Sequence, residues 1–67
     1  MEKQSYSRND LVTVLVDVPR LGVKAGGQVA HVDAIRGEDL YEISWYDATA
    51  RKQVSLIVLQ EWIGLVK

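Results

Sequence analysis

The residues of this chain that could carry out chemistry begin with its only histidine, His31. An imidazole can act as a general base or bind a metal ion, but both tasks need further groups that converge on it. The nearest carboxylate, Asp33, lies two residues further along, on the same face of a predicted strand. One histidine and one carboxylate do not define a metal site. We therefore expect a structural or solvent-facing role for His31, with no metal and no cofactor.

Carboxylates form a second candidate group near the middle of the chain. Paired carboxylates can share acid and base roles in catalysis. Two of these four fall in a predicted turn, where acids commonly serve solvation and local hydrogen bonding. We interpret the group as a solvated acidic rim, with a surface for a basic partner as the alternative, and we expect no catalytic residue. The four are Glu38, Asp39, Glu42 and Asp47.

Basic and aromatic side chains form a third group. Arg51 and Lys52 are close to Tyr46 on a predicted hairpin, and Arg20 and Lys24 lie on the loop after the first strand. Basic side chains beside an aromatic ring can clamp phosphates and stack bases. Ordinary turn charges are the alternative interpretation, because acidic residues balance them. These five residues are candidates for contact with a partner.

Two tryptophans offer large apolar surfaces in a small chain. Burial of one such side chain contributes about 2–3 kcal/mol. Trp45 belongs to the best alternating strand and is predicted to lie in the core. Trp62, near the last turn, is the better candidate for a partly exposed contact residue, so it joins the candidate partner-binding residues.

Five short strands would have to position these side chains. Tyr41, Ile43 and Trp45 fall on one face of the central strand, the clearest alternation of period two in the chain. A turn at 48–51 then leads into the next strand. No stretch has the sustained period of an amphipathic helix. The predicted elements are strands at 11–18, 28–35, 39–47, 52–59 and 63–66, with one 3₁₀ turn at 60–62.

The first of these strands is apolar on both faces. Five of its eight residues are β-branched, a composition that favours a pleated strand. Apolar residues on both faces predict burial on both sides, by the core and by something else. Leu21 and Val23 of the following loop are expected to pack against the core, and the inward face of 54–59 is left open. The residues expected inside on the first two strands are Val12, Val14, Val16, Ala30, Val32 and Ala34.

Length and composition set further limits. A chain of 67 residues makes one domain and buries only about 60% of its unfolded surface. It has no cysteine, and its hydrophobic fraction of 48% leaves a dense core or self-association as routes to stability. The net charge of −1 excludes global steering to nucleic acid or to an anionic membrane. No apolar run is long enough for a membrane span, and the polar start lacks a signal peptide, so we expect a cytoplasmic protein. Residues 1–9 are predicted to be a flexible polar leader before a domain at 10–67.

Four short motifs resemble those of a known family: Asp10-Leu11-Val12, Asp17-Val18-Pro19, 21–26 and 41–47. This family of small bacterial domains has no assigned function, and its pattern looks like Asp-x-Val, Asp-Leu-Pro, Gly-Leu-x-x-Gly-x-x-Gly-x-Val-Val and Tyr-Glu-Val-Glu-Phe. The resemblance covers nearly all of the chain from Asp10 onward. It implies an all-β, five-stranded SH3-like barrel, related in outline to the KOW and Tudor folds. Val29 replaces a family glycine, so a tight KOW-type turn is not implied.

Three functions are compatible with these observations. The first is a non-enzymatic interaction module that binds a protein partner or a second copy of itself, through exposed Val and Leu residues and Trp62. The alternative is a nucleic-acid-binding, KOW- or Tudor-like barrel that uses the basic residues and Tyr46. The third is an enzyme whose composite site forms at an oligomer interface lined by His31 or carboxylates.

Overall fold

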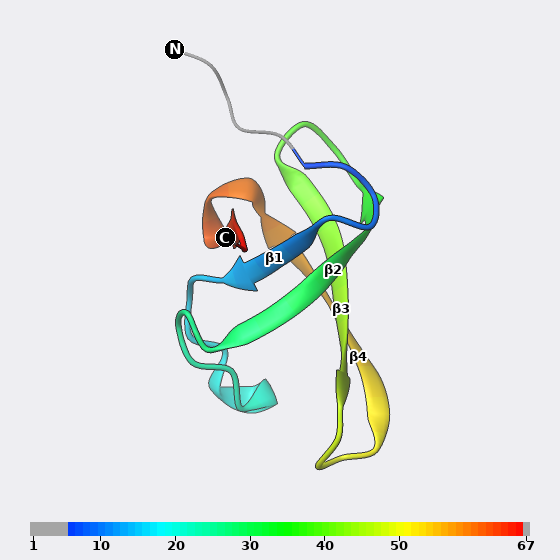
Figure 1. Cartoon of the computed structure of the whole chain (residues 1–67). Coiled ribbons are helices and arrows are strands. Elements are labelled where there is room, and N and C mark those ends of the chain that lie inside the picture. Colours follow the sequence, from blue (N-terminus) through cyan, green and yellow to red (C-terminus); the bar gives the residue numbers. More distant parts are fainter. Residues whose placement is uncertain (1–5, 67) are drawn as a thin grey trace.

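The computed structural model describes residues 6–66 and shows an all-β protein (Figure 1). Its five strands form one antiparallel sheet, and two single 3₁₀ turns, η1 (Pro19–Leu21) and η2 (Gln60–Trp62), are its only helical segments within that range. The predicted five strands and the 3₁₀ turn before the last strand are thus confirmed. The strands are β1 (Leu11–Val14), β2 (Gln28–Ile35), β3 (Leu40–Asp47), β4 (Lys52–Leu59) and β5 (Ile63–Leu65).

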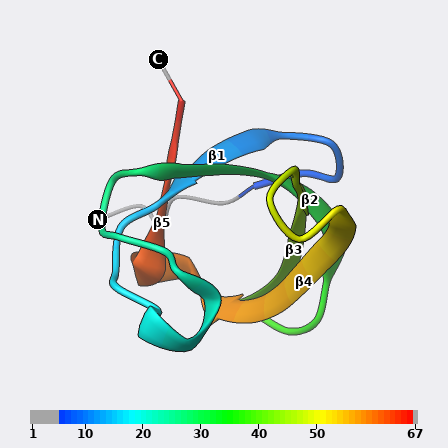
Figure 2. The ribbon, with the colours of Figure 1, turned by 90° about the horizontal axis from the view of Figure 1, so that it is seen from below.

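The sheet curls strongly around its own core. Hydrogen-bonded ladders join the strands in the order β4-β3-β2-β1-β5, which leaves β4 and β5 at the two edges. Figure 2 shows the strands arranged around a common centre. The buried side chains of the core cluster pack together on the inward side. Within residues 6–66 no ladder joins β4 to β5. Closure into an SH3-like barrel therefore stays a prediction.

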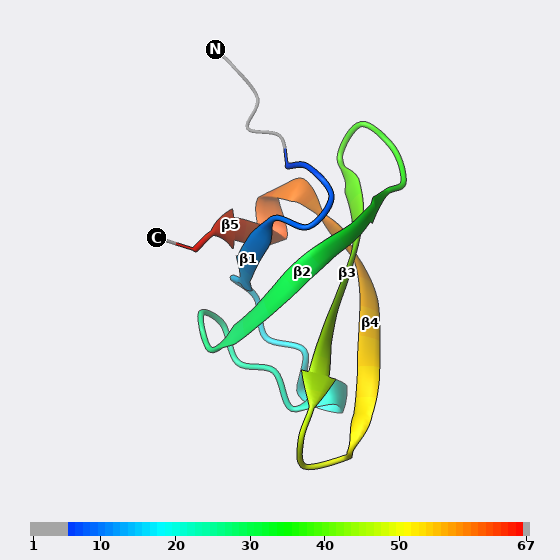
Figure 3. The ribbon, with the colours of Figure 1, turned by 45° about the vertical axis from the view of Figure 1, so that its right-hand side comes forward.

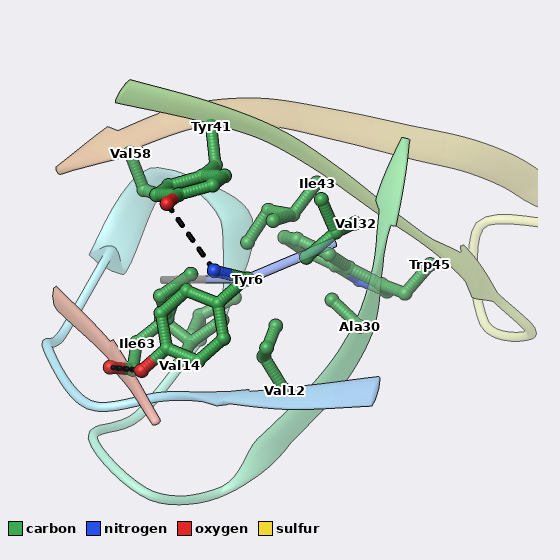
Figure 4. Packing of buried hydrophobic residues seen from close by; sticks show 11 residues of the cluster. Tyr6, Val12, Val14, Ala30, Val32, Tyr41, Ile43, Trp45, Val58 and Ile63 are labelled. Atoms are coloured by element: carbon green, nitrogen blue, oxygen red, sulfur yellow. Dashed lines mark hydrogen bonds between the residues drawn. The ribbon is translucent and has the colours of Figure 1, made fainter. Parts of the chain in front are cut away.

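The core lies on the inward face of this curled sheet (Figure 4). Ile43 is fully buried, and its neighbours Tyr41 and Trp45 are 2% and 6% exposed, which confirms the predicted inward face of β3. Val58 is buried on β4, and the half-buried residues Val54 and Leu56 pack against the core. This result assigns the inward face that the sequence left open.

The first strand is shorter than predicted. It ends at Val14, because the next amide, that of Leu15, donates to the carbonyl of Trp62 at 2.7 Å and the carbonyl of Val14 accepts from Gly26. Val16 therefore lies outside β1, although it still packs against the core. The following connection contains η1. Leu21 and Val23 do pack against the core, as expected.

A bulge changes the face of one predicted core residue. Ladder pairing runs from Val32–Ile43 directly to Ala34–Glu42, so Asp33 is an extra residue on β2. Directly opposed residues of an antiparallel pair point to the same face. Ala34 therefore shares the face of Glu42 and is only half-buried. Its predicted place inside was wrong, because alternation was counted across the bulge.

The segment before β1 is attached to the core where the structure describes it. Tyr6 is 3% exposed, and its hydroxyl donates to the carbonyl of Ile63 at 3.2 Å. The amide of Asn9 donates to the carbonyl of Val32 at 2.7 Å. The expectation of a loose leader thus does not hold for residues 6–9, while its remaining part, 1–5, lies outside the described residues.

None of the helical segments in residues 6–66 has the length and apolar character that crossing a membrane would require.

Candidate interaction surfaces

The outward side of β5, β1 and β2 carries an apolar surface. Strand pairing places Thr13 between Val29 of β2 and Gly64 of β5, and Leu11 opposite His31. The amide of Val66 donates to the carbonyl of Leu11, so Val66 lies on the other side of Leu11. We call this surface the outer β1 face. It consists of Leu11, Thr13, Leu15, Val29, His31, Gly64 and Val66.

Large apolar side chains on this face are open to solvent. Leu11, Leu15 and Val29 are 46%, 47% and 47% exposed, and Val66 is 42% exposed. Leu15 extends across Gly64, because a Cβ atom added to that glycine would lie 3.4 Å from Leu15 Cδ1. The face therefore contains an apolar strip, with Thr13 in its middle, that no described part of the chain covers.

The outer β1 face contains no Asp, Glu, Lys or Arg, and its one ionisable residue is His31. Trp62 adjoins it, since its carbonyl accepts the amide of Leu15, and Trp62 is 38% exposed. The expected partial exposure of Trp62 is confirmed. The prediction that β1 is buried on both sides holds for the core side, where Val12 and Val14 are fully buried. The other side is this exposed face.

A depression of about 410 Å³ lies at the end of the molecule that carries the β3–β4 turn. It lies between η1 and the turn that joins β3 to β4, which Figures 1 and 3 place at the same end. Tyr46 is the most open aromatic ring there, with 62% of its surface exposed, and Trp45 lines the same hollow. The other lining residues are Leu21, Gly22, Gln28, Asp47, Ala48 and Thr49.

Basic residues adjoin the lining of this depression. Arg20 precedes the lining residue Leu21, and Lys52 is the ladder partner of the lining residue Asp47. Lys24 lines a second hollow, which adjoins the first because Gly22 lines both. We call this region the basic end. Its four cations make no ion pair or side-chain hydrogen bond with any described residue. They are Arg20, Lys24, Arg51 and Lys52.

Two carboxylates also lie at the basic end, and backbone amides donate hydrogen bonds to both. Asp47 Oδ1 accepts from the amides of Thr49 at 3.0 Å and Ala50 at 3.2 Å, which shapes the β3–β4 turn. Asp17 Oδ1 accepts from the amide of Ala25 at 2.8 Å across the β1–β2 connection. These carboxylates therefore have local structural partners, whereas the cations are free to meet an external anion.

The six candidate partner-binding residues thus fall into two places. Tyr46 and the four cations gather at the basic end, although they come from two segments that are distant in the sequence. Trp62 stands apart, on η2 beside the outer β1 face. Four apolar residues of that face were not singled out as site residues: Leu11, Leu15, Val29 and Val66. For Leu11 and Leu15 the signal was the apolar outward side of the predicted first strand, whereas Val29 and Val66 are assigned to the face only by the ladder register.

The other predicted groups form no catalytic arrangement among the described residues. His31 is exposed and lies opposite Ser44 in the ladder, but no hydrogen bond joins it to a described side chain. Glu42 forms an ion pair with Arg36. Within residues 6–66, no group of three or more His, Cys, Asp or Glu side chains could hold a metal ion.

Comparison with protein-family models, with curated proteins and with solved structures found no match to this chain.

Proposed function

We propose that this protein is a non-enzymatic interaction module that associates with a second copy of itself through the outer β1 face. The observation that carries this proposal is the exposed apolar strip of Leu11, Leu15, Val29 and Val66 on a face without a charged side chain at its centre. Clustered exposed apolar residues on one surface favour an interaction site over chance exposure. Trp62 at the border of the face supplies the large side chain that often anchors such contacts.

A second copy suits this face for electrostatic reasons. When identical faces meet about a two-fold axis, a charge close to the axis faces its own copy. The outer β1 face has no Asp, Glu, Lys or Arg that would oppose such a contact. Sheets readily pack face to face, at a separation of about 10 Å, through interdigitating apolar side chains. Burial of each square ångström of apolar surface contributes roughly 25 cal/mol.

The size of the chain supports the same proposal. A protein of 67 residues without disulfides has a small core, and oligomerisation is a common source of added stability at this size. Gly64 leaves room for Leu15 to lie flat against β5, which smooths the centre of the face. A partner sheet can therefore approach closely.

Sedimentation velocity over a range of concentrations tests this proposal. Leu11→Lys puts a charge within the apolar strip and should weaken self-association at least tenfold. Ile57→Lys is the matched control, because Ile57 is 54% exposed on the edge strand β4, away from the outer β1 face. The control should associate like the unchanged protein.

Two results would overturn the proposal. One is that the protein without substitutions stays monomeric at every concentration. The other is an equal or larger effect of Ile57→Lys, which would assign self-association to the unpaired edge of β4 instead.

A further inference from the structure

The basic end has the features of a second binding site, and its function does not depend on self-association. We propose that single-stranded nucleic acid binds there, with phosphates against the cations and a base stacked on Tyr46. The site combines an open aromatic ring, a hollow beside it and four cations without partners among the described residues.

The charges are distributed unevenly over the molecule, although the net charge is small. The basic end holds four cations against two carboxylates, Asp17 and Asp47. The rest of residues 6–66 holds two cations against six carboxylates. The net charge of −1 for the whole chain therefore conceals a positive end. Since both carboxylates at this end accept backbone amides, the cations are the groups available to a ligand.

The exposed ring of Tyr46 favours nucleic acid over other anionic ligands. Proteins that bind single strands pair a positive groove with aromatic rings on which bases stack. Tyr46 is 62% exposed and projects from the end of β3, and the depression beside it is lined by Trp45. Gln28 and Thr49, two residues with polar side chains, line the same hollow. An acidic peptide would use the cations but would leave the tyrosine ring without a stacking partner.

The single strand is favoured over a duplex by the shape of the site. The turn of the β3–β4 hairpin and η1 flank the hollow at this end (Figure 3), and its volume of about 410 Å³ is too small to take a duplex. Such a hollow suits one or two splayed nucleotides.

Fluorescence anisotropy with labelled single-stranded RNA and DNA of about 12 nucleotides tests this inference. Binding should weaken as salt rises, with a log–log slope near −0.7 for each phosphate neutralised. Lys52→Glu should weaken binding at low salt and make the slope shallower. Arg8→Glu is the matched control and should change binding little, since Arg8 is exposed and belongs to the segment before β1, outside the basic end.

Stacking is tested separately from charge. Tyr46→Ala should weaken binding at least fivefold, whereas Tyr46→Phe, which retains a ring, should bind nearly as well as the unchanged protein. Because Tyr46 and Lys52 lie on the β3–β4 hairpin and contribute no residue to the outer β1 face, the variants should self-associate normally. A failure here therefore leaves the proposed self-association intact.

Several outcomes would overturn the inference. They are no binding at low salt, equal binding of a polyglutamate peptide of the same charge, tighter binding of the duplex, or an unchanged affinity for Tyr46→Ala. An Arg8→Glu effect as large as that of Lys52→Glu would remove the assignment to this end.

Discussion

The ring of Tyr6 meets the ring of Tyr41 edge to face, with centroids 5.5 Å apart and an interplanar angle of 78°. The amide of Tyr6 donates to the hydroxyl of Tyr41 at 3.3 Å, and the hydroxyl of Tyr6 donates to the carbonyl of Ile63 (Figure 4). Tyr6 therefore links β3 to β5, two strands that are not neighbours in the sheet. Tyr6, which precedes the first strand, thus connects the two sides of the curled sheet across the core.

Removal of this side chain should cost much of the stability. Tyr6→Ala deletes a buried aromatic ring and should lower the free energy of unfolding by about 3–5 kcal/mol, whereas Tyr6→Phe loses only the hydrogen bond to Ile63 and about 0.5–1.5 kcal/mol. Urea denaturation followed by tryptophan fluorescence measures both. Tyr46→Ala, at an exposed tyrosine, is the control and should change stability by no more than about 0.5 kcal/mol. Equal losses at Tyr6 and Tyr46 would contradict this role.

Stability should fall in alkaline solution. Burial raises the pKa of the Tyr6 hydroxyl above its ordinary value of 10.0, and the nearby Tyr41 raises it further. The folded protein therefore holds this proton more tightly than the unfolded chain. The resulting stabilisation is complete below a pH of about 10 and is lost as the pH rises through the raised pKa.

Denaturation series at increasing pH check this expectation. The free energy of unfolding should decrease above a pH of about 10, and Tyr6→Phe should reduce the slope, because Phe has no proton to lose. An identical slope in both proteins would assign the alkaline loss to other groups.

Two glycines should respond in opposite ways to substitution by alanine. At Gly64 an added Cβ would make an ordinary contact with Leu15 at 3.4 Å, and the backbone is an ordinary strand, so Gly64→Ala should stabilise the fold by about 0.5–1 kcal/mol. At Gly26 the φ angle is +78°, so Gly26→Ala should destabilise it by about 1–2 kcal/mol. Thermal denaturation of both variants distinguishes these effects, and a lowered midpoint for Gly64→Ala would be inconsistent with the contact to Leu15.

Local patterns were sufficient to predict most of the fold. The alternation of Tyr41, Ile43 and Trp45 identified both the central strand and its buried face, since period two survives in a regular ladder. It failed at Ala34, because one extra residue at a bulge reverses every later assignment. Tyr6 was missed for another reason. A single aromatic residue in a polar segment carries no period, so only the tertiary contacts identify it as core.

The candidate surfaces were predictable only in part. Tyr46 and Lys52 are close in the sequence and share a hairpin, so their grouping follows from local structure. Their proximity to Arg20 depends on how the long β1–β2 connection folds back, which the sequence pattern did not specify. The outer β1 face also needed the ladder register, because Leu11, Val29 and Val66 come from three strands or their ends.

A dilution series followed by ¹⁵N–¹H correlation spectra tests the central claim most directly. If a second copy packs on the outer β1 face, the amide signals of β1, Val29 and Gly64 should shift with protein concentration, while those of β4 stay in place. Shifts confined to β4, or none at any concentration, would contradict the claim.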